Sequence, residues 1–142
     1  MPAIIPAGII YLDNRSVKIG GIKIYGTPAT LYRGGMAFNY HQGADIGKIW
    51  DDIPNETDIL ITHMPPSGIL DNEAGCPQLL ETVDRIGPKL HLFGHIHDGH
   101  GLYEGGGTLF CNASVCNSPD FVNDVEYRVV RENIRFEFKE ER

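Results

Sequence analysis

Residues 57–95 read "TDILITHMPPSGILDNEAGCPQLLETVDRIGPKLHLFGH" and contain an apolar run, a helical pattern and a second apolar run. Between Leu79 and Ile86 the apolar residues recur at helical spacing, and Gly87 closes the pattern. A strand–helix–strand unit of this kind joins parallel strands of one sheet. The stretch therefore predicts an α/β fold in which the two apolar runs are neighbouring parallel strands.

The segments on either side are predicted to extend this sheet within a single domain of residues 1–142. The pattern favours a buried strand at 7–12, a hairpin over 16–26, a helix over 44–54, a hairpin over 101–114, and closing strands at 125–130 and 134–139. Residues 27–43 form a loop rich in glycine and aromatic residues. It is either a binding loop or a compact loop packed by its own Tyr32, Phe38 and Tyr40.

Composition restricts the partners. The formal net charge is −7 and no run of Lys or Arg occurs, which argues against binding to a nucleic-acid polymer. Any bound phosphate would need positive charge from another source, such as a metal ion. No apolar stretch is long enough to span a membrane, and three unpaired cysteines fit a reducing compartment, so we expect a cytoplasmic protein.

Histidines follow both strands of the central unit. His63 comes directly after the first strand, and His95 and His97 come after the second. Because the carboxyl ends of parallel strands share one edge of a sheet, these three imidazoles are expected to converge. They suit one zinc ion with an open position, or two ions whose shells carboxylates complete. His91 lies within the second strand and is more simply a strand residue, whereas His100 is either a substrate contact or a solvated loop residue.

The segments "DILITHMPP", "PKLHLFGHIHDGHG" and "NAS" resemble the C-terminal half of the calcineurin-like metallophosphoesterases, and within them the metallophosphoesterase-domain-containing subgroup. That superfamily builds its site from five sequence blocks, of which the last two match Thr62-His63 and Gly94-His95-Ile96-His97. The resemblance implies a layered αββα sandwich with mixed sheets and two divalent ions, which are Mn, Fe or Zn. His63 and His95 would bind the second ion and His97 the first.

The resemblance also implies hydrolysis of a small-molecule phosphoester by metal-activated hydroxide, with cyclic nucleotides as candidate substrates of a complete enzyme. Phe38, Asn39 and His100 are our predicted substrate contacts. Some members of the subgroup lack the histidine that corresponds to His95, which weakens their metal site. This chain retains it.

The other three blocks do not match. The sequence contains no Gly-Asp-x-x-Asp and no Gly-Asn-His, so the bridging carboxylate and the histidine that acts as general acid have no counterpart here. We therefore expect a partial domain that lacks the N-terminal part of the fold and holds at most one zinc. Two functions follow. The chain is the C-terminal half of a phosphoesterase, as a fragment, an alternative product or one part of an enzyme completed elsewhere, or it is a non-catalytic module that binds a metal or a phosphate and acts through partners. Self-association is expected in either case.

Overall fold

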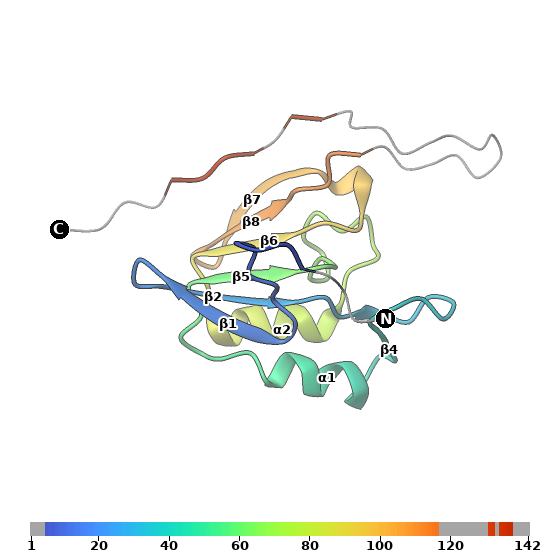
Figure 1. Ribbon diagram of the computed structural model, residues 1–142. Helices are drawn as coiled ribbons and strands as arrows, with labels where there is room; N and C mark the ends of the chain where they lie inside the picture. Colours follow the sequence, from blue (N-terminus) through green and yellow to red (C-terminus); the bar gives the residue numbers. More distant parts are fainter. Residues whose placement is uncertain (1–4, 117–130, 133, 138–142) are drawn as a thin grey trace.

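The computed structural model describes residues 5–116, 131–132 and 134–137. Their main feature is a six-stranded sheet with the strand order β1-β2-β5-β6-β8-β7 (Figure 1). The four inner strands are parallel, and the two edge strands run antiparallel to their neighbours. The α/β class is confirmed. The strands are β1 (Arg15–Ile19), β2 (Ile22–Thr27), β5 (Ile59–Thr62), β6 (Leu90–Phe93), β7 (Gly101–Gly105) and β8 (Thr108–Asn112).

The predicted strand–helix–strand unit is present as β5, α2 (Pro77–Ile86) and β6. β5 and β6 pair in parallel, with Ile59 opposite Leu90. Pro77 suits the first turn of α2, because the N–H that proline lacks would have no partner within the helix there. Gly87 ends the helix in the left-handed conformation at φ 59°, and its N–H donates to the Val83 carbonyl.

Both helices share one hydrophobic core with the sheet. The helix α1 (Ala44–Asp51) contributes Ile46 and Trp50 to this core, which are fully buried. Side chains of this size each contribute about 1.5–3 kcal/mol when removed from water. The Gln78 side chain on α2 accepts the Gly43 N–H and donates to the Gly43 carbonyl, which fixes the start of α1 beside α2. The other members of the core include Tyr25, Leu60, Leu79, Val83, Phe93 and Phe110.

The opposite face of the sheet is also apolar, with Ile59, Leu90 and Leu109 side by side on β5, β6 and β8. The N-terminal segment crosses this face in Figure 1, and Leu12 lies so close to Gly26 that a Cβ there would meet it at 2.5 Å. The described residues contain one further sheet, a parallel pair of two-residue strands, β3 (Thr30–Leu31) and β4 (Asn39–Tyr40). The second large sheet of an αββα sandwich is not among them, so the layered arrangement stays a prediction.

Two of the strand predictions are wrong. Residues 7–12 form no strand: the Ile9 N–H bonds to the Pro6 carbonyl, which makes a turn, and Ile9 and Ile10 are 60% and 55% exposed. Proline and Gly8, at φ 87°, favour this turn over an extended chain. The second wrong prediction is the strand at 134–139, since residues 134–137, which are its described part, are irregular. The predicted strand at 125–130 lies outside the described residues.

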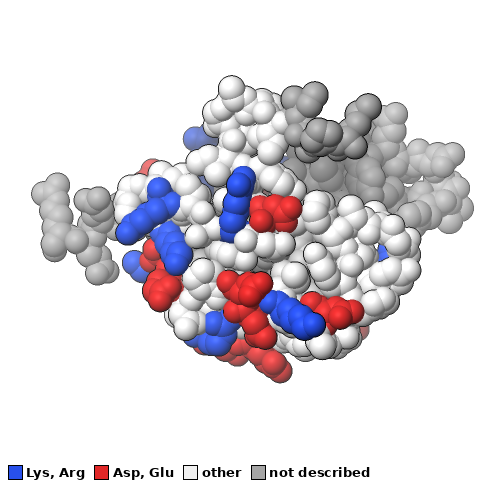
Figure 2. Space-filling model, turned by 60° about the horizontal axis from the view of Figure 1, so that its bottom comes forward, with Lys and Arg blue, Asp and Glu red and all other residues white. Residues whose placement is uncertain are grey.

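Acidic and basic side chains alternate over the face that turns forward in Figure 2. On α1, for instance, Asp45 lies in the first turn and Lys48 in the last, as suits the helix dipole. Neither α1 nor α2 has the length and apolar character of a membrane-spanning helix.

Candidate metal and ligand site

The carboxyl ends of β5, β6 and β8 meet at one edge of the sheet. The Gly94 N–H, just past β6, donates to the His63 carbonyl, just past β5, at 3.1 Å. The Ala113 N–H, just past β8, donates to the Phe93 carbonyl at 2.8 Å. The strand ends are thus in register, and residues that follow them lie beside one another.

His63 and His95 form a pair at this edge. Their ring centroids are 4.6 Å apart and the ring planes are tilted by 55°. The backbone at His95 is left-handed, with φ 67°, and the Ile96 N–H bonds to the Gly94 carbonyl at 2.7 Å. The chain therefore turns sharply at His95 instead of continuing the extended strand β6.

His97 begins a short 3₁₀ helix, η1 (His97–Gly99), and is half-buried. Its charge contributes least among the causes that lower the pKa of His95. Within residues 5–116, 131–132 and 134–137, no three His, Cys, Asp or Glu side chains are grouped as a metal site. The structure brings together His63 and His95, and the three-histidine site stays a prediction.

Both paired histidines are neutral at pH 7. Partial burial lowers the pKa of His63 below its usual 6.5. The pKa of His95 is lowered to about 4, chiefly by burial and further by the charges of His63, Arg33 and His97. Neutral imidazole is the form that binds metal ions, so these shifts favour ligation.

A buried hydrogen-bond network fixes the strand ends that carry this pair. The Thr62 hydroxyl donates to the Met64 carbonyl at 2.7 Å and lies 2.9 Å from His91 Nε2. Because the hydroxyl has a single proton, His91 Nε2–H must donate to Thr62, which assigns the tautomer. His91 is fully buried between Phe93 and Phe110, so it is a strand residue, as the sequence favours.

Asn112 at the end of β8 holds the loop that contains His95 and is fully buried. Its Nδ2 donates to the carbonyls of Leu70 and Ile96 at 3.0 and 2.8 Å, and its Oδ1 accepts the Ser114 N–H. The sequence prediction gave Asn112 no role. Its position at the end of a predicted strand, within the "NAS" motif, was the available signal.

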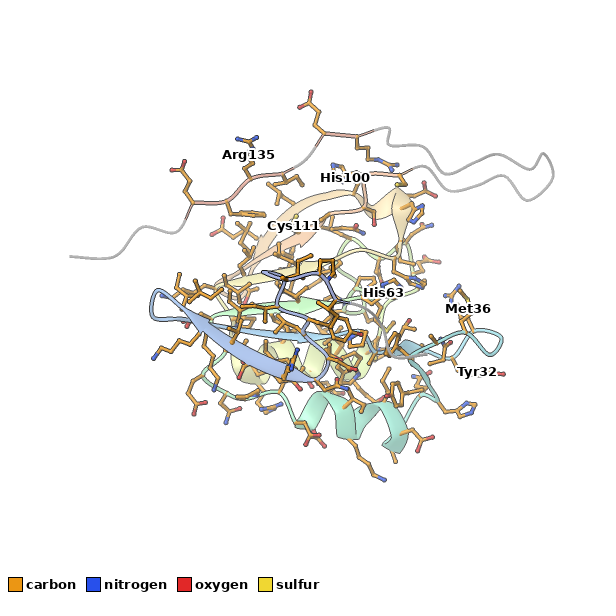
Figure 3. The ribbon with its side chains drawn as sticks, viewed as in Figure 1. Tyr32, Met36, His63, His100, Cys111 and Arg135 are labelled. Carbon is orange, nitrogen blue, oxygen red and sulfur yellow. The ribbon has the colours of Figure 1, made fainter. Side chains whose placement is uncertain are left out.

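A cavity of about 560 Å³ opens beside the histidine pair. Its walls come from β5, the N-terminal segment and the loop of residues 27–43, so this loop faces a cavity as a binding loop would. Figure 3 shows His63 at the end of the sheet on the side of the loop that carries Tyr32 and Met36. The lining includes Tyr11, Leu12, Arg33, Met36, Phe38, Asn39, Ile61, His63 and His95.

The three predicted substrate contacts differ in position. Phe38 and Asn39 line the cavity, while His100 does not and lies apart from His63 in Figure 3. Asn39 bonds within its own loop: Oδ1 accepts the Arg33 N–H at 2.6 Å and Nδ2 donates to the Ala37 carbonyl at 2.7 Å. Asn39 therefore shapes the cavity wall.

Arg33 is the cationic residue in the lining of this cavity, and it was not predicted as a site residue from the sequence. It is the single Arg or Lys between residues 27 and 43, which is the signal that could have found it. The lining contains no Asp or Glu. The site thus combines two neutral imidazoles, one guanidinium and an apolar wall.

The donor set fits one metal ion better than two. His63 and His95 offer two neutral nitrogens side by side, which suits zinc with other ligands completing its shell. Two dications about 3.5–4 Å apart require carboxylates to offset their repulsion. The cavity supplies none, so the described residues fit a single ion.

Comparison with known proteins identifies the group to which the chain is related. It is 45% identical over 114 residues to the Metallophosphoesterase domain-containing protein 1 of Homo sapiens and of Mus musculus, over 75% of this chain and 35% of each relative. It is 40% identical over 113 residues to a UPF0046 protein of Caenorhabditis elegans, over 77% of this chain and 39% of that protein. These similarities confirm the resemblance to the metallophosphoesterase-domain-containing proteins.

The chain spans between about a third and two fifths of the length of these relatives. A solved crystal structure shares the fold, with a TM-score of 0.54 and 17% identity over 72% of this chain and 45% of that one. No family model matches the sequence.

Proposed function

We propose that the chain carries the histidine part of the active site of a metal-dependent phosphoesterase. The observation that supports this most is the contact between His63 and His95 at the carboxyl edge of the parallel strands, beside a cavity with a guanidinium. A divalent ion held there would activate water and neutralise the phosphate. The chain's own residues would orient the ligand: Arg33 binds its charge, and Asn39 holds Arg33 in place.

The substrate proposed is a small-molecule phosphodiester or phosphomonoester, with cyclic nucleotides as one candidate. The relatives' name, metallophosphoesterase domain-containing, supports the reaction class. Hydrolysis of bis(p-nitrophenyl) phosphate with added Mn²⁺ tests the proposal, with His63→Gln as the inactivating variant. His41→Gln is the matched control, because His41 is exposed and stacks on Tyr32 at 4.8 Å. Activity that survives His63→Gln would contradict the proposal.

A second function is favoured by the donor set and by the exposed sheet face. The cavity lacks the carboxylates of a two-ion site, and Ile61 and Leu102 are 37% and 52% exposed on the face opposite the helices. A module that binds one metal or one phosphate and acts through partners would have both features. This face would be covered by a second sheet in a layered sandwich, or by another copy of the chain. Absent turnover with retained zinc binding, and dimers in sedimentation velocity, would support the module.

A further inference from the structure

We propose that the cavity beside His63 and His95 selects phosphoesters whose organic group is flat and apolar, and that Arg33 is the residue that binds their phosphate. The proposal rests on the proposed function only in taking a phosphoester as the ligand. Recognition itself needs no metal ion and no turnover.

The Arg33 side chain is available for an anion. It is exposed on the cavity wall, and the cavity lining contains no carboxylate. The ion pairs within the described residues are Lys23 with Glu56 and Arg131 with Asp98, so no described carboxylate neutralises Arg33. A guanidinium binds a phosphate through two parallel hydrogen bonds, which favours this anion over a single point charge.

The rest of the wall is apolar and partly exposed. Met36 and Phe38 are 72% and 45% exposed, and Tyr11 and Ile61 also line the cavity. A cavity of about 560 Å³ has the size of a site for a small organic molecule and far exceeds a bare phosphate. A planar group seated there would cover these side chains and remove apolar area from water.

The loop holds the charged and the apolar parts in a fixed relation. The Thr30 N–H bonds to the Phe38 carbonyl at 3.0 Å and the Tyr32 N–H to the Tyr40 carbonyl at 2.9 Å, which pairs the two sides of the loop. The Asn39 side chain then accepts the Arg33 N–H. Phe38 is held in the left-handed conformation at φ 57°, a strained geometry of the kind that collects at ligand sites. Such preorganisation lowers the entropic cost of binding.

Isothermal titration of the full chain in EDTA tests the proposal with phenyl phosphate, inorganic phosphate and phenol as probes. Phenyl phosphate is expected to bind at least about tenfold more tightly than either of the others, because each of those engages one part of the cavity. Arg33→Gln should weaken phenyl phosphate about tenfold, whereas Lys48→Gln, the same charge change on the exposed surface of α1, should leave it unchanged. Met36→Ala should lower the affinity for phenyl phosphate and leave the affinity for inorganic phosphate unchanged.

Binding must also be located. The ring-proton resonances of His63 and His95 should shift when phenyl phosphate is added, and those of His41 should not. Three results would overturn the inference: unchanged affinity in Arg33→Gln, equal affinity for inorganic and phenyl phosphate, or binding that leaves both ring resonances in place. If the unmodified chain binds phenyl phosphate but has no phosphoesterase activity, the proposed function is overturned and the present inference stands. Both Arg33 and Met36 are exposed, so their variants should fold, which far-ultraviolet circular dichroism checks.

Discussion

Glycine at position 95 should give a more stable protein than alanine, although both remove the imidazole. His95 has φ 67°, a conformation that costs a residue with a Cβ about 1–2 kcal/mol and costs glycine almost nothing. Glycine loses about 0.4–1 kcal/mol of this advantage through the greater freedom of its unfolded chain. The net expectation is that His95→Gly exceeds His95→Ala by about 1 kcal/mol in free energy of unfolding.

His63 provides the matched control, since it carries the other ring of the pair and its φ is not positive. There the order should reverse, with His63→Gly below His63→Ala by about 0.5–1 kcal/mol. Urea unfolding of the four variants measures both differences, and a gain of about 1 kcal/mol corresponds to roughly 3 °C in thermal midpoint. Equal stability of the two variants at position 95, or alanine above glycine, would refute the left-handed turn.

Three further predictions concern the buried groups around the site. Burial lowers the pKa of His91 to about 3, against 6.5 in an unfolded chain. The contribution of neutral His91 to the free energy of unfolding is therefore complete above pH 6.5. It is lost as the pH falls toward 3, at up to about 1.4 kcal/mol per pH unit. Urea unfolding from pH 7 to 4 should show a shallower loss in His91→Gln, and parallel curves would contradict this. Asn112→Ala should cost about 2–3 kcal/mol, because it leaves the Leu70 carbonyl without a donor and leaves the Ile96 carbonyl with only the Gly99 N–H. A loss below about 1 kcal/mol in the same assay would count against the network. Gly99→Ala should lower the thermal midpoint more than Gly94→Ala, because its Cβ would lie 2.0 Å from the Leu70 carbonyl oxygen, against 3.3 Å from Ser114 Oγ; an equal effect would speak against that close approach.

The central unit of the fold could be predicted because its signals are local. The helical spacing from Leu79 to Ile86 and the closing Gly87 predict α2, and the chirality and parallel pairing of such units place His63 beside the end of β6. The pairing of His63 with His95 follows from this topology. Asn112 and Arg33 were missed because their roles depend on contacts with chain segments far away in sequence.

The wrong predictions have the same origin. Residues 7–12 are apolar enough for a strand, yet a strand needs a partner, and the turn at Pro6–Ile9 leads the chain across the sheet face instead. The hydrogen bond from the Ile96 N–H to the Gly94 carbonyl makes a turn at His95 that no spacing rule reveals.

The most direct test of the account is a zinc titration in competition with a chromophoric chelator. The unmodified chain and His41→Gln should each bind about one zinc ion, and His63→Gln and His95→Gln should each lose most of that affinity, since each removes a ligand. Zinc binding that is equal in all four proteins, or absent from all of them, would contradict a metal site built on the paired imidazoles.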